Sequence, residues 1–432
     1  MWSRQTTIKY VILSMIIASF VTIYLQWISS MNIIHSGFAV SATLGNEAIS
    51  ENNSTQNASI QSTIRQKSGQ ESDRINKYDL KKVLRVLNSS VLMKDGEELR
   101  PLTNYILQPS NLISGIKNTT TEKYRWSAIN VVKSAVRNKY RRMAVRDTWG
   151  EIEELNGTRI KTVFILGTTK NQTVQSYIVK ESEKYGDILQ IDIPDDYEHV
   201  PDKVLAGMQW VSESLPGHWI YSSADDDIAL HVHNFVGFIY DTMKNNTNET
   251  TDNLQPQKLP IICIYSFNRK DKPARDKESK WYMPKETYPP STWPPYCRGG
   301  WYTMPVDTAK KLHSVSRRAR SLYLDDVWIT GILRIKMLIV YSNLEEKSLI
   351  DAGITDAPLA LRNNADLIYG KGEDNLDKVL VSHVWGNIKK KQVNVANRLR
   401  NIWIAWTKKQ PLLLVKNPKT QNIKIDNQKG DE

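Results

Sequence analysis

The chain has 432 residues, a formal net charge of +12 and a mean hydropathy of −0.46. This length accommodates one α/β domain of about 250–300 residues with flanking segments, or two average domains. Because Cys263 and Cys297 are the only cysteines, a domain held by a dense disulfide framework is excluded. The positive charge would suit a nucleic-acid-binding protein, but the amino-terminal segment places the chain in a membrane and removes that partner.

An uncharged and mostly apolar run of 19 residues extends from Tyr10 to Ile28. As a helix it would span about 28 Å, close to the hydrocarbon thickness of a bilayer. Arg4 and Lys9 precede the run, and no charged residue follows before Glu47. This asymmetry predicts a cytosolic tail at 1–9, a signal anchor at 10–28 and a lumenal remainder, which is type II topology. The alternative, a cleaved signal peptide, would have a shorter apolar region of ~7–15 residues.

Nine Asn-x-Ser/Thr sequences lie on the side that would be lumenal, where they predict N-glycosylation. They begin at Asn52, Asn53, Asn57, Asn88, Asn118, Asn156, Asn171, Asn245 and Asn248. Residues 29–122 are rich in Ser, Asn, Thr and Gln, and predict a lumenal stem that buries little apolar area. We expect a folded domain at 123–400 and a basic carboxyl-terminal tail at 401–432.

Strand-like and helix-like patterns alternate through the first half of the expected domain. Strands are predicted at 129–132, 161–167, 187–193 and 218–222, with helices between them at 140–149, 172–185 and 202–214. This order predicts an α/β fold with a parallel sheet, in which ligands collect at the carboxyl ends of the strands. A proline-rich loop at 284–295, a strand at 296–305 and helices at 306–320 and 325–336 are predicted beyond it.

Three consecutive aspartates, Asp225, Asp226 and Asp227, directly follow the fourth predicted strand. Adjacent carboxylates repel one another, and a divalent cation would offset that repulsion. Their hard oxygen atoms suit Mn²⁺ or Mg²⁺, which can bridge the phosphates of a nucleotide-sugar. Such a triplet is also common as a helix cap or a solvated acidic turn. Both interpretations remain open at this point.

Further motifs surround the triplet in a characteristic order. They are VKS at 132–134, RRMAVRDTW at 141–149, VFILG at 163–167, DIL at 187–189, DY at 196–197, KWY at 280–282, PPYCRG at 294–299, LDDV at 324–327 and VSH at 381–383. With these motifs, residues 131 to 385 resemble the animal β-1,3-galactosyltransferase and β-1,3-N-acetylglucosaminyltransferase family. The resemblance implies a GT-A-like, Rossmann-type domain that binds a nucleotide-sugar.

The same resemblance implies an inverting reaction, in which an acceptor hydroxyl attacks the anomeric carbon opposite the departing UDP. Asp326 matches the family's general base, and Asp325 is the alternative. Adjacent residues on a helix point about 100° apart, so only one of the pair can face the acceptor. We therefore expect Asp325 to cap the start of the helix.

Asp227, Asp225 and His383 match the family's metal ligands, and the implied cofactor is Mn²⁺. Contacts with the donor are assigned to Asp225, Asp226, Arg142, Arg146, Lys203 and Trp281. From the residues alone, His383 would be interpreted as a structural histidine. Arg142 and Arg146 lie four apart on one helical face, where salt bridges that fix the helix to the sheet are an equal alternative.

The chain also departs from the family's pattern. Ser223 stands two residues before the triplet, where a lysine is common, and Asp325 replaces a glutamate. Thr330 stands where a glycine is frequent. The candidate metal ligands and the candidate base are unchanged.

The sequence thus predicts a Golgi type II β-1,3-glycosyltransferase with its catalytic domain at 123–400. The expected reaction moves galactose from UDP-galactose to a glycoprotein or glycolipid acceptor, and UDP-N-acetylglucosamine is the alternative donor. A catalytically inactive, glycan-binding lumenal relative is the rival interpretation. Retention of the acidic triplet, the helical aspartate and the late histidine favours the enzyme, because an inactive relative has no chemical need for all of them.

Overall fold

The structure is a computed structural model that describes residues 99–109, 112, 124, 126–246, 260–264, 266–267, 271–341, 354–356, 360–361, 379–384 and 392–409. The expected anchor at 10–28 lies outside these residues, as do Asn52, Asn53, Asn57, Asn88, Asn118, Asn248 and the side chain of Asn245. Within the described part of the chain, no helix has the length and apolar character needed to cross a bilayer.

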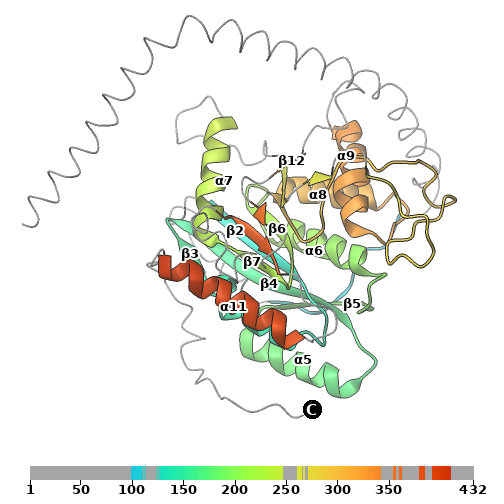
Figure 1. Cartoon of the computed structure of the whole chain (residues 1–432). Coiled ribbons are helices and arrows are strands. Elements are labelled where there is room, and N and C mark those ends of the chain that lie inside the picture. The colour runs from blue at the N-terminus through green and yellow to red at the C-terminus, as the bar shows by residue number, and fades with distance from the viewer. Residues whose placement is uncertain are drawn as a thin grey trace, which may run out of the picture. The chain divides into compact units, whose positions relative to one another are not determined.

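A mixed sheet of nine strands forms the centre of the fold (Figure 1). Its middle consists of four parallel strands in the order β5 (Ile188–Pro194), β4 (Thr158–Thr168), β2 (Trp126–Lys133) and β6 (Ile220–Asp225). The chain runs outward from β2 through β4 to β5, and then returns to the other side of β2 as β6. The predicted parallel pairing of these four strands is therefore confirmed. The strand order reverses between β2 and β6, and ligands of α/β sheets bind at such a switch point.

Further strands extend this parallel core on both sides, through antiparallel pairs except for β12, which runs parallel to β8. Next to β6 lie β11 (Trp301–Pro305), β8 (Ile261–Cys263) and β12 (Ile354–Asp356), while β1 (Tyr105–Leu107) pairs with β5 and β3 (Glu154–Leu155) pairs with β4. The sheet is therefore mixed rather than all parallel. Because β1 lies in the range expected to be stem, the sheet begins before residue 123.

Helices cover both faces of the sheet (Figure 1). One face carries α6 (Val200–Ser214), α8 (Val306–Ser316) and α9 (Arg334–Tyr341), and the other carries α4 (Lys139–Arg146), α5 (Gln172–Tyr185), α7 (Val232–Asn246) and α11 (Gln392–Lys409). Alternation along β2 explains the two layers, because Ile129 and Val131 pack into one core while Ala128 and Val132 pack into the other. A register slip by one residue would exchange these faces, so burial fixes the pairing.

Local signals set the ends of α5. The Asn171 side chain accepts a hydrogen bond of 3.1 Å from the Val174 amide at the amino end, and Gly186 adopts a left-handed φ of 67° at the carboxyl end. An asparagine cap and a glycine in this conformation are frequent helix boundaries. Both bounds of the helix agree with the sequence prediction. The helix predicted at 140–149 ends earlier, and a short 3-10 turn at Trp149–Glu151 follows it.

Two small sheets and one disulfide complete the described fold. A three-stranded sheet contains β13 (Ala360–Leu361), β14 (Val381–His383) and β7 (Ile228–Leu230), and a two-stranded sheet contains β9 (Ser266–Phe267) and β10 (Tyr296–Cys297). The disulfide joins Cys263 of β8 to Cys297 of β10. The helix predicted at 325–336 is a π-helical segment, Val327–Leu333, that continues into α9.

Candidate active site

The end of β2 meets the end of β6 at the switch point, and a lysine connects them to a third element. Lys133 is paired in register with Asp225, and its Nζ lies 2.9 Å from Asp225 Oδ1. The same Nζ lies 3.0 Å from Asp325 Oδ2 and donates to the Gly299 carbonyl at 2.9 Å. Burial disfavours the charged form, but the carboxylates of Asp225 and Asp325 outweigh it and raise the Lys133 pKa. The buried ammonium group of Lys133 therefore joins the acidic triplet to the helix of the candidate base.

The outer aspartates of the triplet have different environments. Burial raises the pKa of Asp225 to about 6, with Lys133 opposing and Asp227 reinforcing the shift. Asp227 is partly buried, which favours a raised pKa, but its hydrogen bond to His383 and the positive charge of Arg141 lower its pKa overall. The Arg141 guanidinium lies 3.3 Å from Asp227 Oδ2, and His383 Nε2 lies 3.2 Å from Asp227 Oδ1.

Asp226, the middle residue, is held inside the protein. Its side chain accepts hydrogen bonds from Ser134 Oγ at 2.7 Å, Asn138 Nδ2 at 2.9 Å and Arg141 at 2.9 Å. Only 4% of the residue is exposed. This carboxylate therefore anchors the turn after β6 to the loop after β2. Its contact with a donor stays a prediction, since all of these partners belong to the protein itself.

A β-ribbon brings His383 beside the triplet. Strand β14 pairs antiparallel with β7, so that His383 lies opposite Ile228, and the Val384 amide donates to the Asp227 carbonyl at 2.8 Å. Burial lowers the imidazole pKa, but the hydrogen bond and charge of Asp227, together with the charge of Asp225, raise it overall. Metal ligation would require this imidazole to lose its proton.

The donor atoms of Asp225, Asp227 and His383 fit a divalent cation. One ligand atom from each residue lies within 4.8 Å of the other two. Asp227 Oδ1 is buried and lies 3.2 Å from His383 Nε2, so two members of this group already face each other. A bound cation would also offset the repulsion between the carboxylates of Asp225 and Asp227. Two carboxylates and an imidazole are a ligand set that divalent transition metals accept.

Asp326 lies at the start of the π-helical segment. Its Oδ1 accepts a hydrogen bond of 2.7 Å from the Val327 amide. Burial raises its pKa to about 7, and the negative charge of Asp325 adds to the shift, while the Val327 amide and Lys133 oppose it. A carboxylate that titrates near neutral pH is suited to general-base catalysis.

The expected division of roles between the two helical aspartates is corrected in one respect. Asp326 itself caps the segment, whereas Asp325 forms the ion pair with Lys133. The physical reason is the buried ammonium group of Lys133, which binds the Asp325 carboxylate at 3.0 Å, while the Val327 amide bonds to Asp326. The Val327 amide bonds to Asp326 Oδ1, so the other carboxylate oxygen, Oδ2, takes no part in the cap.

Two glycines allow the two halves of the site to approach each other. A Cβ at Gly299 would lie 3.3 Å from Asp326 Cβ, and one at Gly300 would lie 3.6 Å from His383 Nδ1. The Gly300 carbonyl also accepts from the Asp225 amide at 2.8 Å. The Gly299–Gly300 segment thus passes between the candidate base and the candidate metal ligands.

The two arginines that were expected to contact the donor, Arg142 and Arg146, lie in buried ion pairs with carboxylates of the protein. Arg142 is fully buried and contacts both oxygens of Glu181 at 2.9 and 2.7 Å. Arg146 contacts Glu181 at 2.7 Å and both oxygens of Asp187 at 2.8 and 2.9 Å. These contacts correspond to the structural alternative. The arginine that reaches the triplet is Arg141, whose side chain points to another face of α4, and sequence reasoning missed it.

Lys203 and Trp281 differ in their surroundings. The Lys203 ammonium is buried against Asp195 and donates to the Ser134 carbonyl at 3.2 Å. Trp281 is 54% exposed. Nearby, burial and the charges of Asp325, Asp326 and Asp225 raise the pKa of Tyr197 to about 12, which indicates that this tyrosine faces the carboxylates. Donor contacts by Lys203 and Trp281 stay predictions.

Comparison with known proteins decides the family. A sequence model described as Galactosyltransferase matches residues 140–345, which include the triplet and Asp326. Lactosylceramide 1,3-N-acetyl-beta-D-glucosaminyltransferase A of Xenopus laevis is 32% identical over 280 residues, which are 61% of this chain and 71% of that protein. The chain belongs to the galactosyltransferase family.

This galactosyltransferase-family protein has further relatives. Beta-1,3-galactosyltransferase 1 of Homo sapiens is 33% identical over 193 residues, which are 45% of this chain and 55% of that protein. Among solved structures, galactosyltransferase LgtC with donor and acceptor sugar analogs is a distant likeness, with 10% identity, a TM-score of 0.29 and coverage of 67% of this chain and 97% of that one. Family membership confirms the predicted family and the predicted class of enzyme, a hexosyltransferase.

Proposed function

We propose that the protein is an inverting β-1,3-glycosyltransferase that moves galactose from UDP-galactose to a glycan hydroxyl. One observation carries the proposal: the candidate cation ligands and Asp326, a partly buried carboxyl with a pKa near 7, flank the same Gly299–Gly300 segment. Inversion requires a base on the side of the sugar opposite the leaving group. The position of the candidate base and the candidate cation ligands on either side of one segment supports this arrangement.

The residues of this chain would divide the work as follows. Asp225, Asp227 and His383 would hold Mn²⁺, which when bound supplies positive charge to the diphosphate of the leaving UDP. Asp326 would accept the proton of the attacking hydroxyl. Lys133 would keep the two groups at a fixed spacing, because its ammonium binds a carboxylate on each side.

The identity of the donor sugar is the finer part of the proposal. The relatives named above include both a galactosyltransferase and an N-acetylglucosaminyltransferase, at 33% and 32% identity. Galactose is our first choice, and N-acetylglucosamine is the alternative. A glycoprotein or glycolipid carries the acceptor sugar.

Golgi membrane residence is part of the same proposal. It is supported by the apolar run at 10–28, by the basic residues that precede it and by sequons beyond it. In this orientation the catalytic domain is lumenal.

Transfer assays test the proposed reaction directly. The full chain in detergent is incubated with UDP-galactose, UDP-N-acetylglucosamine or UDP-N-acetylgalactosamine and with acceptors that end in different sugars, with Mn²⁺ or with EDTA. We expect Mn²⁺-dependent formation of a β-1,3 linkage, strongest with UDP-galactose. Failure of all donors, with Asp326→Asn as the inactive reference, would support the rival interpretation of an inactive glycan-binding relative.

A further inference from the structure

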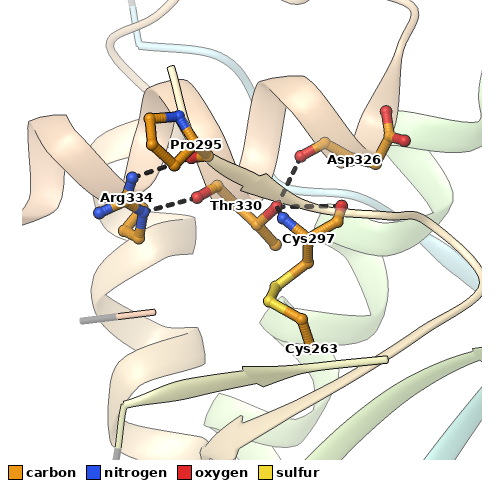
Figure 2. Close-up of a disulfide and its surroundings, with 6 residues drawn as sticks. All are labelled: Cys263, Pro295, Cys297, Asp326, Thr330 and Arg334. Atoms are coloured by element: carbon orange, nitrogen blue, oxygen red, sulfur yellow. Dashed lines mark hydrogen bonds between the residues drawn. A yellow bond between two sulfur atoms is a disulfide. The ribbon is translucent and has the colours of Figure 1, made fainter. Parts of the chain in front are cut away.

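Thr330 lies at a junction between the candidate base and the disulfide-linked strand. It belongs to the π-helical segment, and the residue is fully buried. Figure 2 shows its hydroxyl between Asp326 and Cys297. The hydroxyl donates to the Asp326 carbonyl at 2.7 Å and accepts from the Cys297 amide at 2.9 Å.

These two hydrogen bonds fix the hydroxyl in one orientation. A hydroxyl has a single proton, and the Asp326 carbonyl at 2.7 Å is a much better acceptor than the Cys297 carbonyl at 3.5 Å. The Cys297 amide supplies the proton for the remaining contact. Thr330 therefore connects the backbone of the candidate base to the backbone of β10.

The strand on the other side of this connection is itself fixed. Cys297 is bonded through its sulfur to Cys263 of β8, a strand of the main sheet (Figure 2). Arg334, which is also fully buried, donates to the Thr330 carbonyl at 2.8 Å and to the Pro295 carbonyl at 2.9 Å. The 295–297 segment and the helical segment are thus held together at more than one point.

Close backbone approach makes these bonds geometrically feasible. A Cβ at Gly331 would lie 3.1 Å from Tyr296 Cβ and 3.3 Å from Pro294 Cγ, so a larger residue there would push the segments apart. In this chain Gly331 provides the approach, and Thr330 beside it provides the hydrogen bonds. π-Helical turns are frequent at functional sites, and here the turn directly follows Asp326.

We propose that Thr330 is a positioning residue whose hydroxyl fixes the backbone of Asp326, and thereby the direction of its carboxylate, relative to the acceptor hydroxyl. This inference rests on the proposed function of Asp326 as general base. Because the carboxylate is attached to the backbone that Thr330 holds, a shift of the helix start would misalign the proton acceptor. A misplacement of about 1 Å can lower turnover by roughly 10²-fold.

The test compares Thr330→Val, which keeps the shape but lacks the hydroxyl, with Thr330→Ser, which retains it. In the full chain we expect Thr330→Val to lower kcat by roughly 10²-fold while the affinity for UDP with Mn²⁺ stays within about twofold. Thr330→Ser should remain within about fivefold of the wild type, because its hydroxyl can make both hydrogen bonds. Amide exchange at Cys297 should accelerate only in Thr330→Val.

Thr303→Val is a matched control, because Thr303 is a buried threonine on β11 whose hydroxyl donates to the Tyr221 carbonyl at 3.0 Å and accepts from Ser222 Oγ at 3.0 Å. It should lower the melting temperature without lowering kcat. Equal turnover in Thr330→Val and wild type, or equal losses in Thr330→Val and Thr330→Ser, would overturn the positioning role.

A second measurement separates this inference from the proposed function. The pH dependence of the difference in melting temperature between the wild type and Asp326→Asn reports the titration of Asp326. The same comparison is then made between Thr330→Val and the double variant Thr330→Val/Asp326→Asn. A displaced titration midpoint of Asp326 in this second pair would support the positioning of Asp326, and an unchanged midpoint would contradict it. If the wild type transfers no sugar from any donor, the proposed function fails, while this measurement still decides whether Thr330 holds Asp326.

Discussion

Asp326 is in an environment that both favours its proposed chemistry and lowers stability. Burial and the neighbouring Asp325 disfavour its ionised form, so its pKa rises to about 7. The proton of an acceptor hydroxyl is better accepted by such a carboxylate than by one of ordinary acidity. The same groups make the folded protein resist ionisation of Asp326.

The first prediction concerns turnover. Asp326→Asn should lower kcat by about 10²–10⁴-fold and leave the affinity for UDP unchanged, because the amide keeps the shape but cannot accept the proton. Steady-state transfer and calorimetry with UDP and Mn²⁺ measure the two quantities. The control is Asp307→Asn, which alters a partly exposed aspartate in the first turn of α8. Near-normal turnover in Asp326→Asn would exclude this residue as the base.

The second prediction concerns stability and pH. The Asp326 pKa is 3.8 in the reference state and about 7 in the folded protein, so between these values the folded state keeps a proton that the unfolded state has lost. The contribution of this residue to stability must therefore fall as pH rises from about 4 to 7. Thermal melts should show Asp326→Asn gaining stability relative to wild type across that window. A difference that is constant with pH would contradict the raised pKa.

The third prediction concerns the cation. Asp227→Ala should abolish Mn²⁺-dependent binding of UDP, because a methyl group cannot ligate a cation. Since the His383 pKa is raised and ligation requires neutral imidazole, Mn²⁺ affinity should also increase as pH rises through the His383 titration. Calorimetry at several pH values measures both effects, with Asp307→Asn again as control. Unchanged UDP affinity in Asp227→Ala would eliminate the site.

At the scale of elements, the periodicity of apolar residues predicted the strands and helices that local sequence determines. The parallel strands were found because each alternates with an amphipathic helix, and α5 was bounded correctly because Asn171 and Gly186 are strong end signals. The candidate ligands were placed on the correct edge of the sheet by this order. Their contact with His383, however, depends on the pairing of β14 with β7, for which the sequence has no local signal.

Other features depend on distant groups and were not predictable in the same way. The capping role was assigned to Asp325 instead of Asp326, because the charge that binds Asp325, Lys133, is distant in sequence. Arg142 and Arg146 share a helical face, but only the positions of Glu181 and Asp187 show that this face points into the protein. The disulfide between Cys263 and Cys297 likewise required the three-dimensional arrangement.

The fourth prediction belongs to this scale. The disulfide closes a loop between residues 34 apart in sequence, and the chain-entropy model gives it about 3–4 kcal/mol of stabilisation. Replacing both cysteines by alanine should therefore lower stability by that order, as denaturant unfolding measures. Because Cys297 also donates its amide to Thr330, kcat should fall more than UDP affinity. A stable double variant with normal kcat would show that β10 is fixed without the disulfide.

At the scale of the whole molecule, the proposed topology requires that sequons in the folded domain be accessible for glycosylation. Asn156 is exposed in the turn between β3 and β4, with a φ of 49°, and Asn171 is exposed at the start of α5. Asn171 accepts the Val174 amide through Oδ1, so a glycan on its nitrogen would leave the helix cap intact. Both positions are therefore compatible with lumenal glycosylation.

The fifth prediction is that Asn156 and Asn171 carry glycans in the full chain expressed in animal cells, because a cytosolic amino terminus places both in the lumen. Aspartate is the sharpest replacement, since it removes the sequon while still capping a helix and tolerating a left-handed conformation. Asn156→Asp and Asn171→Asp should each increase mobility on a denaturing gel by one glycan, and the double variant by two. Endoglycosidase treatment should abolish these differences. Identical mobility of all variants, with an amino-terminal tag lost by cleavage, would contradict the type II topology and leave the signal-peptide alternative.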